Sequence, residues 1–287
     1  IHKATPYDIA NIYTDCVKIN ELAKNASSLE GAVAHKAAAF KGEPVDETKK
    51  ICDELENIFN IDYCYKINDL SIEKLNNCDI HNLCFINPGI SDKIDTLMND
   101  CINAKKQLNA ITSALSEIIG VTEKSKGKKS ETSYIKIHET SNSDPILIGT
   151  KRRVKFLKDN IVNMQNKIKK ISYCDANNQE QFFEIDLSSI RSHSIGSNKK
   201  DESVNNPLIV GLTKKIQKSN NELIFELISF FKNWICSFSH FEPLTIISSY
   251  ITQIDLLQCK AYIADTYNYC KPSIIPSNKS YLSFEAI

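Results

Sequence analysis

The sequence predicts a mainly α-helical fold: a bundle of long helices with a small mixed α/β domain inserted at its far end. Two long segments place apolar residues at alternating spacings of three and four, which is the period of one helix face. The chain also has only eight glycines and eight prolines among 287 residues. This scarcity disfavours a fold built from many short strands and tight turns.

The first long helix is expected to start after Pro88 and Gly89, with Ser91 as its N-cap and Asp92 in its first turn. Its apolar positions continue over four heptads until Gly120, where we expect the helix to end: Ile94, Leu97, Cys101, Ala104, Leu108, Ile111, Leu115 and Ile118. Such a continuous apolar stripe predicts that the helix packs along a partner helix.

The partner helix is expected to begin at Asn206 and Pro207, since proline suits the first helical position, and to end near His240. It carries a broad apolar stripe: Leu208, Leu212, Ile216, Leu223, Leu227, Phe230 and Trp234. Another helix should begin at Pro243, with Ile247, Ile251, Ile254, Leu257, Ala261 and Ala264 on one face. Two earlier helices are predicted over residues 6–22 and 45–59.

The segment between the long helices has a different pattern, and we expect three parts: first helices in residues 1–120, an insert in 121–206, and returning helices in 207–287. Within the insert, alternating apolar residues predict two strands, and the remaining stretches suit a short helix and two polar loops. The strands are expected over 134–139 and 182–190, the helix over 151–168, and the loops over 124–131 and 192–206.

Positive charge is concentrated in the insert. The whole chain has 35 basic and 35 acidic side chains, but residues 122–206 have 16 Lys and Arg against 11 Asp and Glu. All three arginines, Arg152, Arg153 and Arg191, lie there. Arginine suits phosphate because its planar head group can bond two oxygens at once. The insert is therefore the predicted contact region for a polyanion.

The sequence disfavours a secreted, a membrane-spanning and a metal-binding protein. The ten cysteines have no regular spacing and the start has no apolar targeting segment, which favours a reducing intracellular compartment, nucleus or cytoplasm. No membrane partner is expected, because the most apolar run, residues 223–235, is too short to span a bilayer. Cys78, His81 and Cys84 have metal-ligand spacing but lack a fourth ligand, so no metal site is predicted.

Catalysis is not expected in this segment. The sequence contains no Gly-x-x-x-x-Gly-Lys-(Ser/Thr) phosphate loop, and no Ser-His-Asp set, Cys-His set or carboxylate pair stands out. Asp255, in an apolar helix, suits a structural hydrogen bond better than a catalytic role. The chain starts at Ile1 and closes without a polar tail, so we interpret it as part of a longer protein.

Three stretches resemble the MutS family of DNA mismatch-repair proteins and occur in family order. Residues 251–272 are similar to a late core helix of the family, with matches at Ile254, Asp255, Cys259, Ala261, Ala264, Tyr269, Lys271 and Pro272. Residues 86–108 resemble the entry to the family's lever helix, with matches at Pro88, Gly89, Ser91, Ile94, Asp95 and Leu97. Residues 133–140 resemble the strand that opens its clamp domain.

The resemblance implies a helical lever that carries a clamp, and a clamp that closes on the DNA backbone. It implies double-stranded DNA as the partner and a homodimeric or heterodimeric parent protein. ATP and Mg²⁺ are expected for that parent, a DNA-dependent ATPase, and no cofactor for this segment. The long insert and the Lys, Asn and Ile richness are similar to divergent members from giant viruses, which would add a viral factory as a location.

On this interpretation the basic residues of the insert contact DNA phosphates, which position a protein without reading sequence. The predicted contacts are Lys151, Arg152, Arg153, Lys155, Lys158, Arg191, Lys199 and Lys200. A coiled-coil scaffold that binds protein partners is the alternative, because the heptads alone would suffice for it. A helical enzyme is a third class, and the missing catalytic residues disfavour it.

Overall fold

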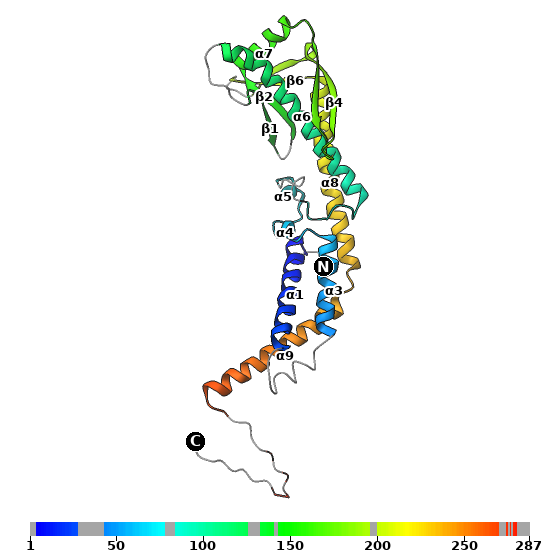
Figure 1. The fold of residues 1–287 in the computed structure, drawn as a ribbon, viewed down its shortest axis with the longest axis vertical. Coiled ribbons are helices and arrows are strands. Elements are labelled where there is room, and N and C mark those ends of the chain that lie inside the picture. Colours follow the sequence, from blue (N-terminus) through cyan, green and yellow to red (C-terminus); the bar gives the residue numbers. More distant parts are fainter. Residues whose placement is uncertain are drawn as a thin grey trace. The chain divides into compact units, whose positions relative to one another are not determined.

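The structure, a computed structural model, describes residues 4–27, 43–77, 84–125, 133–140, 143–195 and 200–269 and four positions beyond them, Ile274, Pro276, Asn278 and Lys279. The described part is mostly helical with small antiparallel sheets (Figure 1), in agreement with the predicted mainly α class. The chain divides into two compact units. One contains Ile1–Tyr13 and Glu54–Phe238, and the other contains Thr14–Asp53 and Ser239–Ile287.

The helices and strands follow each other in one order along the chain. They are α1 (Pro6–Ser27), α3 (Glu43–Ile58), α4 (Ile61–Cys64), α5 (Ile72–Asn77), α6 (Asp92–Ser125), β1 (Lys136–Thr140), β2 (Ser143–Thr150), α7 (Lys151–Asn163), β3 (Ile168–Cys174), β4 (Glu180–Asp186), the 3-10 turn η1 (Leu187–Ser189), β5 (Arg191–Ile195), β6 (Asp201–Asn205), α8 (Pro207–Ser237) and α9 (Phe241–Thr266). None of these described helices is long and apolar enough to cross a bilayer.

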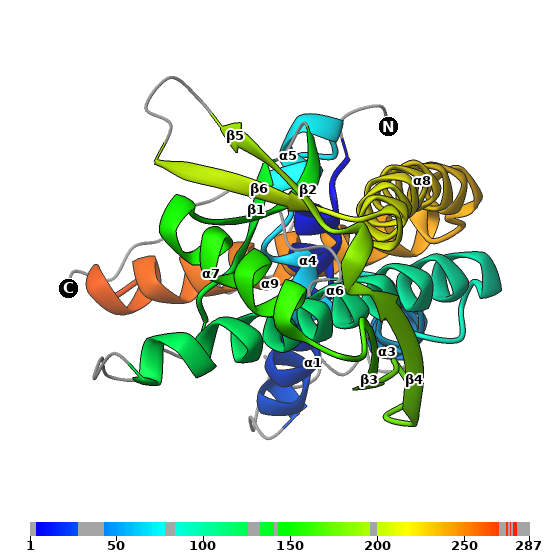
Figure 2. The same ribbon diagram turned by 90° about the horizontal axis from the view of Figure 1, so that it is seen from above.

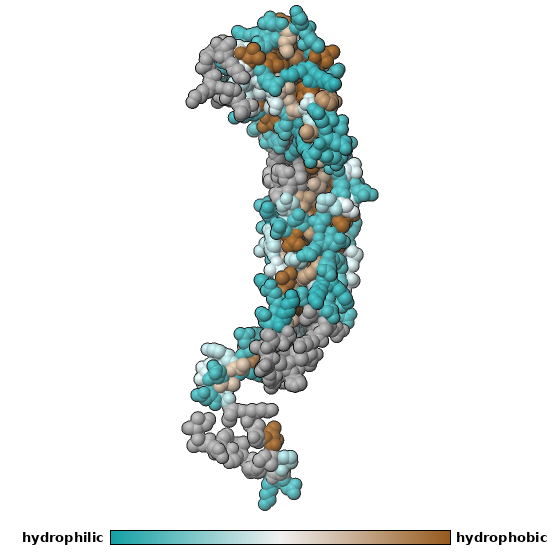
Figure 3. All heavy atoms as spheres, viewed as in Figure 1, coloured by the Kyte–Doolittle hydropathy of each residue, from teal (hydrophilic) through white to brown (hydrophobic). Residues whose placement is uncertain are grey.

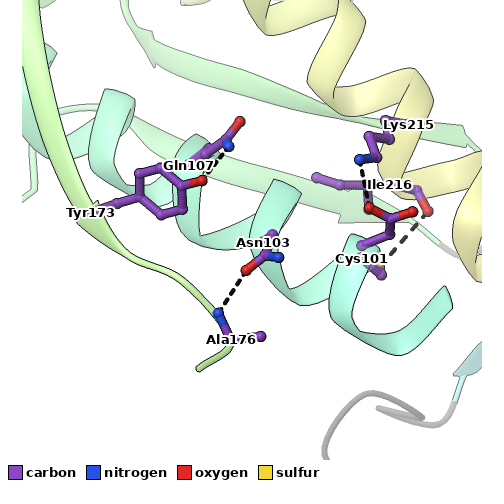
Figure 4. Close-up of polar contacts among 8 residues, drawn as sticks. Cys101, Asn103, Gln107, Tyr173, Ala176, Lys215 and Ile216 are labelled. Atoms are coloured by element: carbon purple, nitrogen blue, oxygen red, sulfur yellow. Dashed lines mark hydrogen bonds and ion pairs between the residues drawn. The ribbon is translucent and has the colours of Figure 1, made fainter. Parts of the chain in front are cut away.

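Helices α6 and α8 pack along each other in the larger unit (Figure 1), as the two apolar stripes predicted. In the α6 stripe every predicted residue is buried except the half-buried Leu97. Polar pairs lie beside the apolar contact: the Cys101 thiol donates to the Ile216 carbonyl at 3.9 Å, and Lys215 pairs with Asp100 at 2.8 Å (Figure 4). Helix α8 is therefore the partner on which the apolar stripe of α6 packs.

Both long helices begin where the sequence predicted. The Ser91 hydroxyl accepts a hydrogen bond from the Ile94 N–H at 3.5 Å, so Ser91 is the N-cap of α6. Just before it, Gly89 has φ +87°, a conformation that glycine adopts without steric cost. Asn206 caps α8, because its side-chain oxygen accepts from the Leu208 N–H at 2.7 Å.

The predicted end of α6 at Gly120 is wrong, since the helix continues to Ser125. Ile119 is fully buried and Glu123, beyond the glycine, is 3% exposed. A Cβ on Gly120 would lie 3.4 Å from the ring of Tyr134. Tertiary packing of this last turn therefore outweighs the weak helix propensity of one glycine.

A four-stranded antiparallel sheet lies at one end of the α6–α8 pair, with strand order β1-β2-β6-β5. Figure 2 shows α7 between this sheet and α6. The buried face of α7 consists of Val154, Leu157 and Ile161, which face the buried sheet residues Leu147 and Val204 in one apolar core. The sheet and α6 together thus fix how α7 is rotated.

Strands β3 and β4 form a separate two-stranded ribbon that is anchored on α6 (Figure 4). The Asn103 side chain accepts a hydrogen bond from the Ala176 N–H at 2.6 Å, and Lys106 donates to the Asp175 carbonyl at 2.7 Å. Ile171 and Ile185 on the inward face of the ribbon are buried in the same core as α6. The ribbon is therefore an extension of the larger unit's core.

The predicted elements of the insert need four corrections, one of which is that the strand expected over 182–190 ends at Asp186 and is followed by the 3-10 turn η1. Residues 192–206 are not a polar loop, because β5 and β6 form a hairpin within them. The short helix ends at Asn163 instead of residue 168, where β3 begins. Strands β2 and β3 were not predicted. The predicted loop at 124–131 lies mostly outside the described residues, apart from the last turn of α6.

Aromatic side chains fill the larger unit near α4 and the C-terminal half of α8. The rings of Phe59 and Trp234 lie 4.6 Å apart, and Phe85 and Phe231 stack edge-on at 6.0 Å. Phe59, Phe85 and Phe231 are fully buried. The core is therefore mainly aromatic in this region, whereas the core between α6 and α8 is mainly aliphatic.

The second unit contains the later part of α1, the earlier part of α3, and α9. Thr48 is fully buried and donates to the Asn20 side chain at 2.6 Å, beside the buried Ile51. On α9, Ile247 and Tyr250 are buried, whereas most of the predicted apolar face is half-buried or exposed. Asp255 is exposed, and the structural hydrogen bond expected for it stays a prediction.

Candidate nucleic-acid interface

Helix α7 starts with an unusual concentration of positive charge. Lys151, Arg152 and Arg153 occupy its first turn, which has no acidic residue, and Thr150 before it makes no side-chain cap hydrogen bond. The N-terminus of a helix carries a partial positive charge, so cations there are unfavourable by themselves. An anion at this end would offset both the helix dipole and the three side chains.

Close packing brings α7 directly onto the preceding strand. A Cβ on Gly149 would lie 3.3 Å from a methyl group of Val154, and the position is buried. A side chain at this position would therefore require Val154 to shift slightly. The Lys151 N–H donates to the Lys200 carbonyl at 2.9 Å, which joins the start of the helix to the β5–β6 hairpin.

The basic residues of α7 share a hollow of about 790 Å³. Spacings of four and three residues put Lys151, Lys155 and Lys158 on one side of the helix. The hollow is lined by Lys151, Arg152, Lys155, Phe156, Lys158, Asp159 and Glu202, so cations outnumber carboxylates in its wall. We call the side chains of Lys151, Arg152, Lys155, Lys158 and the adjoining Lys200 the α7 basic surface.

Arg152 forms an ion pair with a carboxylate of α6. Its Nη2 atom lies 2.9 Å from each carboxylate oxygen of Glu123, whose side chain is 4% exposed. The ring centroid of Phe156, one turn along α7, lies 5.2 Å from the guanidinium carbon. The Arg152 side chain still keeps 48% of its surface exposed. It therefore joins the two helices and also faces solvent.

Lys158 belongs to a short polar chain across the sheet. Its ammonium group donates to the Ser192 hydroxyl at 2.7 Å, and that hydroxyl donates to a Glu202 carboxylate oxygen at 2.6 Å. Part of the Lys158 charge is thereby offset. Lys151, Lys155 and Lys200 are exposed and make no ion pair with any described residue. These three lysines are the cations most available to an external anion.

The other predicted contact residues lie apart from this surface. The Arg153 guanidinium carbon lies 5.0 Å from the ring centroid of Tyr134, on the side of α7 that faces the start of β1. Arg191 is exposed and lies opposite Asn205 in the pairing of β5 with β6. It is four residues along β5 from the end of the hairpin that adjoins Lys200, a distance of about 13 Å. Lys199 lies outside the described residues.

Sequence reasoning missed Glu123, Tyr134 and Phe156, the residues that hold the two arginines of α7 in place. Glu123 is separated from Arg152 by 29 positions, and no local spacing rule relates them. An aromatic residue four positions after an arginine on a helix is a usable signal for Phe156. A search limited to basic residues does not find acidic or aromatic side chains that orient them.

The described residues contain no group of three or more His, Cys, Asp or Glu side chains that could hold a metal ion. Of the three residues with metal-ligand spacing, Cys78 and His81 lie outside the described residues, and Cys84 is buried. Burial raises the pKa of the Cys84 thiol, which disfavours its thiolate.

No protein-family model matches this sequence, and no curated protein is significantly similar to it. The resemblance to the MutS family thus stays a prediction from three stretches. Of the matched residues, Pro88, Gly89 and Ser91 lie at the start of α6, and Ile254 and Asp255 lie on α9, whereas Lys271 and Pro272 lie outside the described residues.

Proposed function

We propose that this chain binds double-stranded DNA through its phosphate backbone, with the α7 basic surface as the contact. In this proposal it is the DNA-clamping and lever segment of a MutS-like mismatch-recognition ATPase. It contributes no catalysis itself. The ATP and Mg²⁺ sites and the dimer contacts would belong to the parent protein.

The observation that carries the proposal is the row of α7 cations that line one hollow, with the exposed Lys200 joined to Lys151 through the backbone. Lys151, Lys155 and Lys158 line this hollow, and the backbone hydrogen bond between Lys151 and Lys200 joins the start of α7 to the β5–β6 hairpin. The positive end of α7 lies at the same point, without an acidic first-turn residue. A phosphate backbone supplies a row of negative charges, which fits such a surface without any base contact.

The long helices give this surface a mechanical connection. Helix α6 continues past the sheet to Ser125, and Glu123 in its last turn bonds Arg152 directly. In the proposal, α6 and α8 act as the lever, so a change at the surface could bias the rest of the larger unit. Binding at either end of such an arm can influence the other only if the two arm positions differ in affinity.

The test is duplex binding as a function of salt. Fluorescence anisotropy with a labelled duplex should show affinity that falls steeply as salt rises, because each neutralised phosphate contributes about 0.9 to the slope of log affinity against log salt. Matched and mismatched duplexes should bind alike, since phosphate contacts read no sequence. A slope near zero would contradict the proposal.

A second candidate, a scaffold that binds protein partners, is favoured by one observation on α9. Large apolar side chains are exposed along this helix, among them Leu256 at 54%, Ile263 at 44% and Tyr262 at 68%. Exposed apolar rows of this kind are typical of helices that pack on a partner. Concentration-dependent self-association or partner binding that is insensitive to salt, without duplex binding, would favour the scaffold.

A further inference from the structure

We propose that Glu123 is a positioning residue for the α7 basic surface: it holds the Arg152 guanidinium in the orientation that receives a DNA phosphate. The inference rests on the proposed function and adds to it a residue of the opposite charge. An acidic side chain beside a phosphate site would ordinarily count against binding. The contacts of Glu123 indicate instead that this carboxylate supports phosphate binding.

The Glu123 carboxylate has no access to bulk water, since the residue is 3% exposed. A carboxylate removed from water is costly unless a cation and hydrogen bonds compensate for it. Within the described residues that compensation comes from Arg152, whose Nη2 lies 2.9 Å from both carboxylate oxygens. Moving the guanidinium away would leave a buried carboxylate without a cation. This cost restrains the position of the Arg152 head group.

Phe156 adds a second restraint, because its ring lies under the guanidinium at 5.2 Å. A carboxylate on one edge and an aromatic ring on one face together fix both the position and the plane of the head group. Lys151, Lys155 and Lys200 have no such restraint within the described residues, and Lys158 has only its hydrogen bond to the Ser192 hydroxyl. Among the described cations of this surface, Arg152 is therefore the one held by both a buried carboxylate and an aromatic ring before a ligand arrives.

The restrained head group keeps donors for a ligand. A guanidinium has five N–H groups, and the bonds to Glu123 use only those of Nη2. No described residue accepts from Nη1 or Nε, while Arg152 is 48% exposed and lines the hollow with Lys151 and Lys155. A phosphate can accept from two guanidinium N–H groups at once, and a donor fixed beforehand loses less freedom on binding.

The two possible roles of Glu123 predict changes of opposite sign. If Glu123 acts only as a nearby negative charge, Glu123→Gln should tighten duplex binding. If Glu123 positions Arg152, the same change should weaken binding by about tenfold or more, as expected for a hydrogen bond to a charged group, and flatten the salt slope by about 0.9. The experiment uses the 287-residue chain, with fluorescence anisotropy at several salt concentrations.

Two matched controls separate positioning from charge and from helix packing. Glu117→Gln removes an exposed carboxylate of the same helix, paired with Lys169, and should leave affinity within about twofold or raise it slightly. Asn160→Ala removes another tie between the same helices, the bonds from the Asn160 amide to the Ile118 carbonyl and the Thr122 hydroxyl. It should lower the melting temperature but preserve duplex affinity in the folded protein.

A double-mutant cycle tests whether Glu123 acts through Arg152. Arg152→Gln should weaken binding to a similar extent as Glu123→Gln, and the double variant should be no weaker than either. Should Glu123→Gln fail to fold, Glu123→Asp keeps the charge, withdraws it from Nη2, and should show the same direction of change. Tighter binding by Glu123→Gln, or an equal loss of affinity in Asn160→Ala, would overturn the inference.

Failure of the inference can be told apart from failure of the proposed function. If reversal of the charges of Lys151 and Lys155 weakens duplex binding while Glu123→Gln does not, only the positioning role is wrong. If the unmodified chain shows no salt-dependent duplex binding, the proposed function is wrong and the positioning role is wrong with it.

Discussion

The side-chain amide of Gln107 donates a 2.6 Å hydrogen bond to the hydroxyl of Tyr173, which lies 66 positions later in the chain. This bond joins α6 to the β3–β4 ribbon in a part-buried position (Figure 4). Tyr173 also contacts Phe183 on the opposite strand, with ring centroids 5.7 Å apart. The Tyr173 side chain thus joins the ribbon to α6 through a hydrogen bond and joins the two strands of the ribbon to each other through a ring contact.

Tyr173→Phe should lower the free energy of unfolding by about 1 kcal/mol, because it removes one hydrogen bond but keeps the ring contact. Urea unfolding measures this change. Duplex affinity should not change, since the ribbon makes no part of the α7 basic surface. A loss of affinity in the folded variant would mean that the ribbon takes part in binding.

Leu108→Asp should be far more damaging. Leu108 is fully buried in the apolar core shared by α6 and α8. An uncompensated buried carboxylate costs several kcal/mol, so the melting temperature should fall sharply or folding should fail. Leu108→Ala, which creates only a cavity, should cost about 2–5 kcal/mol. An unchanged melting temperature in the aspartate variant would contradict the packing described above.

Alkaline pH should weaken the fold through buried thiols. Burial raises the pKa of Cys16 and of Cys64 from 9.0 to about 12. In the unfolded chain these thiols ionise near 9.0, while the folded chain still binds their protons. Their contribution to stability is complete below 9.0 and is lost as pH rises toward 12. Urea unfolding across this range measures the decline, which should be shallower in Cys16→Ala.

Arg152→Glu should destabilise the protein more than Lys155→Glu. The first change places a second carboxylate against the buried Glu123, whereas Lys155 is exposed and pairs with no described residue. Like charges without a cation between them are costly when one of them is buried. Thermal unfolding compares the two variants directly. Equal melting temperatures would mean that Glu123 is more accessible to water than its 3% exposure indicates.

The long helices could be predicted because their information is local. Apolar spacing over four heptads identifies the buried face of α6, and Ser91 and Asn206 signal the two helix starts by their capping chemistry. The mainly α class follows from the same pattern. The end of α6 was predicted at Gly120 because glycine has a weak helix propensity. In the structure the helix continues, with Gly120 packed against Tyr134, and the apolar pattern of the helix gives no sign of that contact.

The sheet could not be predicted in full because its strands depend on distant partners. β5 and β6 are rich in Ser, Asp, Asn and His, which have low strand propensity, but β6 is completed by pairing with β2 on one side and β5 on the other. The charge-based prediction pointed to the region of α7. It could not tell that Arg152 is paired with Glu123 and Arg153 packs on Tyr134, while the lysines stay exposed.

The central claim is that the α7 basic surface contacts DNA phosphates, and the double variant Lys151→Glu/Lys155→Glu tests it most directly. Both residues are exposed, so the fold should survive, and loss of two contacts should flatten the slope of log affinity against log salt by about 1.8. The matched control is Lys214→Glu/Lys232→Glu, which makes the same charge change at exposed positions of α8. We predict weaker, less salt-dependent duplex binding for the first variant and little change in slope for the control. Equal affinity and slope in the two folded variants would contradict the claim.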